Sequence, residues 1–158
     1  TFDPNLLPYC SKFNLPVCVM HMKGSPENMQ NNPKYENILI EVFNFLENQI
    51  GMLVQAGISR DQIIADVGIG FGKNKGHNLA LIKNISLFHG LGVPLLLGVS
   101  RKSIISNVAK VEKTSDRVHG SIALAISALG QGVQLFRVHD VAETKQAFDL
   151  WVAVNFGD

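Results

Sequence analysis

Hydrophobic residues gather in four short continuous runs along the chain, which are Val17–Met20, Ile63–Asp66, Pro94–Gly98 and Val133–Val138. Each run is rich in Val, Ile and Leu and is bounded by Gly, Pro or polar residues. Continuous apolar runs of this length are typical of strands that are buried on both faces, as in a parallel sheet. The pattern therefore predicts four strands of one parallel sheet.

A helical pattern follows every run, over residues 35–56, 77–88, 101–109 and 116–129 and from Asp140 onward. In the first of these segments the apolar residues recur with the 3.6-residue spacing of a helix that packs on a sheet. We expect Asp140 to be the N-cap of the last helix, in a capping box with Glu143. The side chains that this last helix should bury are Val141, Ala147, Phe148, Trp151 and Val152.

The alternation of strands and helices predicts a parallel α/β fold with right-handed crossovers. Two architectures fit it, the doubly wound sheet and the (β/α)8 barrel. Four units make only half of a barrel, which leaves two open sheet edges and an uncovered apolar face. The chain also begins with Thr1 rather than Met, which indicates a processed or cut start. We therefore expect partner strands, either upstream in the same gene or in a second polypeptide.

Composition narrows the class of protein. The 158 residues are 46% hydrophobic and 17% charged, which is typical of one globular domain, and the net charge of +1 gives no footprint for nucleic acid or an acidic membrane surface. No apolar run reaches the roughly 18 residues that span a bilayer, and no signal peptide opens the chain. Cys10 and Cys18 form no metal or disulfide motif, so we expect buried thiols in a reducing compartment. These features predict a soluble, cytoplasmic protein.

Nearly all unusual polar residues follow directly after the four apolar runs, in the segments 20–24, 66–73, 98–103 and 137–140. In a parallel α/β fold the loops at the carboxyl ends of the strands meet at one end of the sheet. The turns at the opposite end, over residues 56–59 and 90–92, contain little besides small and apolar residues. This asymmetry predicts an active-site rim.

Asp66 closes a strand that should be buried, where an unpaired carboxylate is costly. It either caps the glycine-rich loop that follows or accepts hydrogen bonds from an N–H/NH2 edge, such as a 2-amino-4-oxo ring presents. Gly68, Gly70 and Gly72 let the backbone of that loop approach a ligand closely, but their spacing fits neither a P-loop nor a dinucleotide fingerprint. Phe71 is either a stacking lid or a buried anchor of the loop.

Ser100, Arg101 and Lys102 precede a helix, so N–H groups and two cations converge there. That arrangement suits an anionic or carbonyl-bearing ligand, with a solvated first-turn pair as the alternative. Arg137 and His139 alternate along the last strand, so both should point to one side. Together they suit a diphosphate clamp, unless Arg137 pairs with an internal carboxylate.

His21 and Met20 lie at the end of the first run. A lone His at a strand end is more often a hydrogen-bonded structural group than a catalyst, and Met20 either lines a flat ring or packs in the core. The sequence contains no His-Glu-x-x-His motif and no carboxylate cluster, so we expect no metal ligands in this chain.

Four of these blocks together resemble dihydropteroate synthases. The blocks MHMKGSP (20–26), DVGIGFGK (66–73), GVSRKS (98–103) and RVHDV (137–141) resemble, in order, the family's segments after the fifth to eighth barrel strands. The resemblance extends from about residue 16 to residue 152, with Val67 standing where the family usually has Pro. It implies that residues 1–158 are the C-terminal half, strands 5 to 8 with their helices, of a (β/α)8 TIM barrel whose N-terminal half is missing.

The resemblance also implies roles for individual residues. The implied pterin-binding residues are Asp66, Lys102, Met20, Phe71 and Gly98. The implied neighbours of 4-aminobenzoate are Ser100 and Arg101, and the implied ligands of diphosphate are Arg137 and His139. Among all of these, Lys102, Arg137 and His139 are the expected catalytic groups.

The implied reaction joins 6-hydroxymethyl-7,8-dihydropterin diphosphate to 4-aminobenzoate and yields 7,8-dihydropteroate and diphosphate, a step of folate biosynthesis that sulfonamides target. Mg2+ would be held mainly by the diphosphate and by the missing half, and the protein would be a homodimer. Two alternatives stay open. The chain is either a non-catalytic pterin- or folate-binding module, or a fragment that is inactive without its N-terminal half.

Overall fold

The computed structural model describes residues 5–157, and its four strands form one parallel sheet. The strands are β1 (Val17–Met20), β2 (Ile63–Asp66), β3 (Leu95–Leu97) and β4 (Leu135–Phe136), and they lie in the order β1-β2-β3-β4. The predicted α/β fold with a parallel sheet is confirmed. A doubly wound sheet reverses its strand order at a switch point, whereas here every crossover advances by one strand, which is the progression of a barrel.

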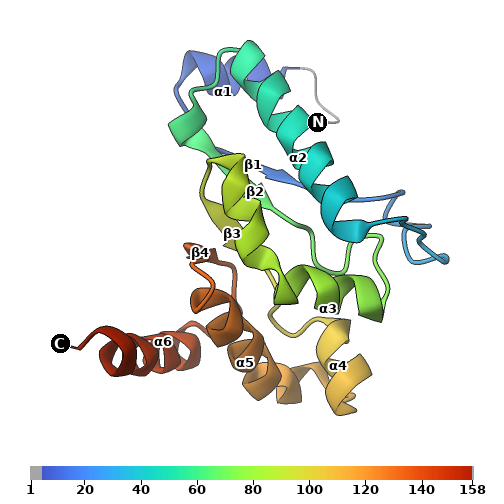
Figure 1. Ribbon diagram of the computed structural model, residues 1–158, viewed down its shortest axis with the longest axis vertical. Helices are drawn as coiled ribbons and strands as arrows, with labels where there is room; N and C mark the ends of the chain where they lie inside the picture. The colour runs from blue at the N-terminus through green and yellow to red at the C-terminus, as the bar shows by residue number, and fades with distance from the viewer. Residues whose placement is uncertain (1–4, 158) are drawn as a thin grey trace.

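Helices connect the strands (Figure 1). The α-helices are α1 (Leu6–Lys12), α2 (Ile38–Gln55), α3 (Lys75–Lys83), α4 (Ser103–Ala109), α5 (Val118–Leu129) and α6 (Val141–Phe156). Among the described residues, three 3-10 helices supplement them, η1 (Arg60–Gln62), η2 (Ile85–Leu91) and η3 (Thr114–Arg117). The sequence pattern did not indicate α1. The helix expected over residues 77–88 is divided at Asn84, whose side-chain amide and backbone N–H both donate to the Ala80 carbonyl and end α3.

The N-cap residue of helix α2 determines where the helix begins. The Asn37 side chain accepts hydrogen bonds from the N–H groups of Leu39 and Ile40, so the helix starts at Ile38 rather than at residue 35. One stripe of the helix is buried, and its members are Ile38, Val42, Leu46, Ile50 and Leu53. Their spacing of four, four, four and three residues is the predicted helical period.

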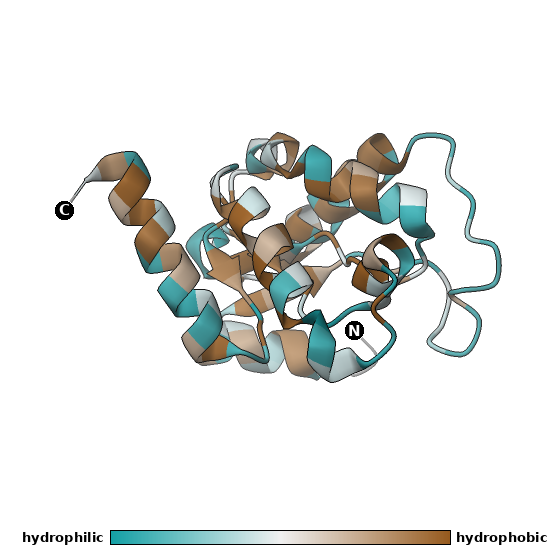
Figure 2. Ribbon diagram, turned by 90° about the horizontal axis from the view of Figure 1, so that it is seen from below, coloured by the Kyte–Doolittle hydropathy of each residue, from teal (hydrophilic) through white to brown (hydrophobic). Residues whose placement is uncertain are grey.

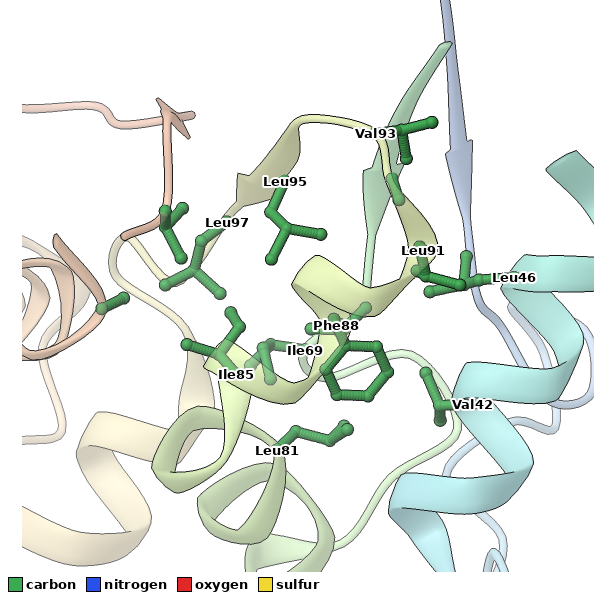
Figure 3. Packing of buried hydrophobic residues seen from close by; sticks show 14 of the residues in the cluster. Val42, Leu46, Ile69, Leu81, Ile85, Phe88, Leu91, Val93, Leu95 and Leu97 are labelled. Atoms are coloured by element: carbon green, nitrogen blue, oxygen red, sulfur yellow. The ribbon is translucent and has the colours of Figure 1, made fainter. Parts of the chain in front are cut away.

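The hydrophobic core lies between the sheet and the helices. One face of the sheet contributes Ile63, Ala65, Leu95 and Leu97, each at most 1% exposed. Figure 3 shows the side chains that meet this face from α2, α3 and η2, which are Val42, Leu46, Leu81, Ile85, Phe88 and Leu91. The close packing of these side chains holds the strands in register, and so it also determines where the strand ends lie.

The opposite face of the sheet is less covered. Cys18 is exposed, and Ile64 and Leu96, which have the same orientation in the pleat, are half-buried. The expectation of two buried thiols is therefore correct for Cys10 and wrong for Cys18, because this face has no covering layer among residues 5–157. Asp66 shares this face, two residues beyond Ile64, so its carboxylate stands at the end of the open side of the sheet.

Two expectations about α6 are wrong. Val141 is 64% exposed and Val152 is 42% exposed, because α6 packs against α5 and extends away from the sheet (Figures 1 and 2). Asp140 precedes the helix but its side chain makes no cap hydrogen bond, so there is no capping box with Glu143. The Asp140 carboxylate binds Arg101 instead, and a bidentate ion pair outcompetes a cap.

None of the helices within residues 5–157 is long and apolar enough to cross a membrane.

Candidate functional site

Asp66 is the buried carboxylate at the end of β2, with only 2% of the residue exposed. Its Oδ1 accepts a hydrogen bond of 2.7 Å from the Gly68 N–H, and its Oδ2 lies 3.6 Å from Arg137 Nη2. Burial raises the pKa of this carboxyl, while the Gly68 N–H and the cations of Lys102 and Arg137 act to lower it. One oxygen therefore caps the loop, as one sequence alternative predicted, and the other faces a cation.

The glycine-rich loop after β2 is held by side chains along its whole length. Each of the five consecutive carbonyls of residues 68–72 accepts a hydrogen bond from a side chain. The donors are Lys73 for residues 68 and 71, Lys102 for residue 69, Gln30 for residue 70 and Tyr35 for residue 72. The Asn78 side chain also accepts from the Gly70 N–H at 2.8 Å. The backbone of this loop is therefore preorganised.

Gly68 allows the loop to pack directly on the segment after β1. Its φ of +71° lies in the left-handed region, and a Cβ there would be 1.9 Å from the His21 carbonyl oxygen. Gly72 repeats both features, with φ +66° and a Cβ position 2.2 Å from the Lys23 carbonyl oxygen. Backbone therefore meets backbone at these two points, which no other residue type permits.

Lys102 leans over this loop from the start of α4. Its Nζ donates to the Ile69 carbonyl and lies 4.6 Å from the centre of the Phe71 ring. Burial lowers the pKa of Lys102 to about 8, with the Asp66 charge acting to raise it. Phe71 is half-buried beneath the ammonium, so it is not the buried anchor that one alternative described.

A strand-end hollow of about 210 Å³ is lined by Gly98, Ser100, Lys102, Arg137, Val138 and His139. Arg137 and His139 thus face one hollow, as their alternation predicted. A Cβ on residue 98 would be 3.0 Å from Arg137 Nη2, so glycine at this position makes room for the guanidinium. Arg137 is 61% exposed in its side chain, and its pairing with Asp66 realises the internal-carboxylate alternative.

Ser100 orients His139. The buried Ser100 hydroxyl oxygen accepts from the His139 backbone N–H at 3.1 Å, and it lies 2.9 Å from His139 Nδ1. Two contacts from one hydroxyl determine both the backbone and the ring position of the histidine.

Arg101 and Met20 do not line the strand-end hollow. The Arg101 guanidinium forms a bidentate ion pair with Asp140, and its backbone N–H donates to the Ser121 hydroxyl at 2.8 Å. Met20 lies beside Asp66, its register partner on the neighbouring strand, and lines a second hollow along β1. The structure therefore brings together Asp66, Lys102 and Arg137, with Met20 next to them and Arg101 apart.

Sequence reasoning missed Lys73, a lysine that is only 2% exposed beneath the loop. It also treated His21 as an isolated group, whereas His21 Nδ1 lies 2.8 Å from Lys73 Nζ. The only signal in the sequence was a lysine directly after three alternate glycines, and a lysine in such a loop is ordinarily expected to be exposed to solvent.

The described residues, 5–157, include no group of three His, Cys, Asp or Glu side chains that could hold a metal ion. The residues of the strand-end hollow are cationic or neutral, so they do not fit an Mg2+ site by themselves.

Comparisons with known proteins agree on one family. The model of a family described as pterin binding enzyme matches residues 1–139. The dihydropteroate synthase of Escherichia coli (strain K12) is 43% identical over 145 residues, which are 92% of this chain and 51% of that protein. A Yersinia pestis dihydropteroate synthase in a sulfonamide drug complex superposes with a TM-score of 0.94 at 40% identity, over 99% of this chain and 57% of that one.

The dihydropteroate synthase of Thermus thermophilus, solved in complex with 4-aminobenzoate, gives a TM-score of 0.91 at 37% identity, over 96% of this chain and 62% of that one. The chain thus spans about half the length of the curated relatives it matches.

Proposed function

Because the chain belongs to the pterin-binding enzyme family, we propose that it is the C-terminal half, strands 5 to 8, of the (β/α)8 barrel of a dihydropteroate synthase. The proposed reaction condenses 6-hydroxymethyl-7,8-dihydropterin diphosphate with 4-aminobenzoate to 7,8-dihydropteroate and diphosphate. The observation on which this proposal rests is the meeting of a buried carboxylate, Asp66, with the cations of Lys102 and Arg137.

Asp66 and Lys102 are complementary to a pterin edge. The ring offers adjacent N–H and NH2 donors, which suit a carboxylate that cannot reach water, and a carbonyl and ring nitrogens, which suit an ammonium donor. When the ring binds Asp66, Arg137 is free to leave its 3.6 Å contact, since its side chain is already mostly exposed. The guanidinium then turns to the diphosphate, and His139 adds a second donor from the same hollow.

The reaction requires little from the protein beyond the positioning of these side chains around the substrate. The CH2–O bond to diphosphate breaks, the electron-rich pterin carries the developing positive charge, and Arg137 and His139 stabilise the departing anion. The neutral amine of 4-aminobenzoate forms the new C–N bond and then releases a proton to solvent. No general base is demanded.

In the proposed complex, Arg101 exchanges its partner Asp140 for the carboxylate of 4-aminobenzoate. Its guanidinium is bidentate to Asp140, and the carboxylate of 4-aminobenzoate presents the same fork. Ser100 links the two anion sites, because it is next to Arg101 in the sequence and its hydroxyl contacts His139.

Mg2+ belongs to the proposal only as an ion bound by the diphosphate and by groups other than the residues described here, and no step above passes through it. A homodimer and a cytoplasmic location are further expectations of the same proposal.

The proposal is tested by measuring turnover in the intact protein, by which we mean this chain together with the N-terminal half of the barrel. With pterin diphosphate and 4-aminobenzoate it should release dihydropteroate and diphosphate in equal amounts, measured by chromatography and a diphosphate assay. Arg137→Ala should lower kcat by roughly 100-fold or more and weaken binding of a pterin monophosphate far less, because a lost charged contact to the leaving group acts in the transition state. Lys145→Ala, which removes an exposed cation on α6, is the control.

Equal losses of turnover and binding in Arg137→Ala would argue against the anion clamp. Pterin binding by the intact protein without turnover, and without competition by diphosphate, would favour the non-catalytic pterin- or folate-binding module.

A further inference from the structure

Lys73 is a buried cation whose hydrogen bonds are complete. Its Nζ lies 2.9 Å from the Gly68 carbonyl oxygen, 3.0 Å from the Phe71 carbonyl oxygen and 2.8 Å from His21 Nδ1. An ammonium group has three N–H donors, so these three acceptors account for all of them. A charge removed from water is tolerated only when it is satisfied in this way.

The acceptors of Lys73 flank the part of the loop that holds Lys102. Between the Gly68 and Phe71 carbonyls lies Ile69, whose own carbonyl accepts from Lys102 Nζ. The Phe71 ring lies 4.6 Å from the same Nζ, and Gly70 lies against the Lys102 side chain. The protein groups that contact the end of Lys102 therefore belong to a segment that Lys73 clamps at both ends.

We propose that Lys73 is a positioning residue for Lys102: by clamping the loop to His21, it keeps the Ile69 carbonyl and the Phe71 ring where they hold the Lys102 ammonium beside Asp66. The inference rests on the proposed function in so far as Lys102 acts on the pterin. It assigns Lys73 no contact with substrate.

His21 suits the clamp because it is neutral. Burial and the neighbouring Lys73 lower the pKa of His21 to about 4, with Lys23 acting in the same direction and Glu41 opposing it. Burial lowers the pKa of Lys73 to about 7, while Asp66 acts to raise it and Lys102 to lower it.

The contact between the two residues survives this titration. An ammonium donates to Nδ1, and a neutral amine accepts from an Nδ1–H after a change of tautomer. The clamp therefore holds the loop on both sides of neutral pH.

The first experiment compares Lys73→Met with Lys75→Met in the intact protein. Lys75 is exposed at the start of α3, two residues further on, so it is a matched control. Lys73→Met should raise KM for the pterin diphosphate roughly tenfold and change KM for 4-aminobenzoate less than about twofold, because a displaced Lys102 affects the pterin alone. Lys75→Met should leave both constants unchanged.

The second measurement does not depend on turnover. Titration of 13C-labelled lysines by NMR should show the pKa of Lys102 near 8 in the unchanged protein and nearer the ordinary lysine value in Lys73→Met, because the released side chain regains water. The assignment comes from Lys102→Met.

Lys73→Met leaves two buried carbonyls without a donor, so a milder variant guards against misfolding. His21→Phe keeps a ring packed edge-on to Phe45 while it removes the ring nitrogens, including the Nδ1 acceptor of Lys73, and it should raise the pterin KM roughly threefold. The proposal is overturned by an unchanged pterin KM and an unchanged Lys102 pKa in whichever variant folds. An equal rise in both KM values with an unchanged Lys102 pKa overturns it too. If the unchanged protein has no synthase turnover, the proposed function fails, and the Lys102 titration alone decides this inference.

Discussion

The surroundings of the Asp66 carboxylate favour ligand binding at the expense of folding stability. Its carboxylate is almost wholly buried, and the nearest cation, Arg137, is mostly exposed and 3.6 Å away. An exposed partner at that distance offsets little of the desolvation of a buried carboxylate. The group is therefore ready to gain hydrogen bonds from a ligand that the protein itself does not supply.

We predict that Asp66→Asn stabilises the intact protein at neutral pH and weakens pterin binding. Since burial raises the pKa of Asp66, the folded state holds this proton more tightly than the unfolded state does. The contribution of Asp66 to the free energy of unfolding falls as the pH rises from its ordinary pKa of 3.8 through the raised pKa of the folded state. Above that raised pKa the contribution is lost completely. An amide keeps the acceptor for Gly68 and avoids the charge.

Thermal unfolding from pH 3 upward should therefore lack this fall in Asp66→Asn, and calorimetry should show pterin affinity reduced by roughly 10- to 100-fold, the cost of losing charged hydrogen bonds. Asp149→Asn, at an exposed site on α6, should match the unchanged protein in both measurements. A lower melting temperature for Asp66→Asn at neutral pH would show that the Arg137 pair stabilises the fold after all.

At the scale of single residues, the sequence predicted roles for most charged residues that follow strands but assigned none to Lys73. Asp66, Lys102 and Arg137 stand out because strand ends converge in a parallel fold. Lys73 becomes a buried group only because the segment after β1, 52 residues earlier, packs its carbonyl and imidazole against the loop. A contact between residues so distant leaves no local pattern.

At the scale of elements, the loop of residues 67–73 tolerates few substitutions, because its glycines pack directly against other backbone. We predict that Gly68→Ala destabilises the intact protein by more than the roughly 1 kcal/mol of left-handed strain, because its Cβ would lie 1.9 Å from a backbone oxygen that cannot move away alone. Gly51→Ala is the matched control, since nothing lies within 4 Å of its Cβ position in the C-terminal part of α2. It should stabilise the protein by about 0.5–1 kcal/mol.

Thermal unfolding of the two alanine variants decides this prediction. If Gly68→Ala melts within a degree or two of the unchanged protein, the segment after β1 yields easily and the loop is not preorganised.

The elements that the sequence predicted well are those whose pattern comes from the core. The strands β1 and β2 match their apolar runs residue for residue, and α2 is shorter than predicted by three residues at its start, where Asn37 caps it, and by one residue at its end. The run over 133–138 overestimates β4, because Arg137 bonds to Leu97 but then leaves the ladder to enter the strand-end hollow. Asp140 looked like a cap because a local motif gives no warning of Arg101, which is far away in the sequence.

At the scale of the whole molecule, the part of the sheet that the structure describes ends at two edge strands, each of which is paired on one side only. Within residues 5–157, β1 pairs with β2 alone and β4 with β3 alone, while the face that contains Cys18 is partly open. Apolar side chains also remain exposed along α6, with Val154 at 83% and Phe156 at 76%. Unpaired edges and exposed apolar residues of this kind favour association with other chains. It stays a prediction that further strands complete the fold.

We predict that the isolated 158-residue chain self-associates and binds pterin weakly. Its open strands offer backbone donors and acceptors to any second chain, and Asp66 stands at the end of the uncovered face. Light scattering coupled to size-exclusion chromatography measures the association, and binding of an apolar dye measures the exposed surface. A double substitution, Val154→Lys with Phe156→Lys, separates the two causes: it should reduce association if α6 drives it and leave association unchanged if the strand edges do. A monodisperse monomer with normal synthase turnover would contradict the prediction, because it would mean that four strands alone suffice for a closed site.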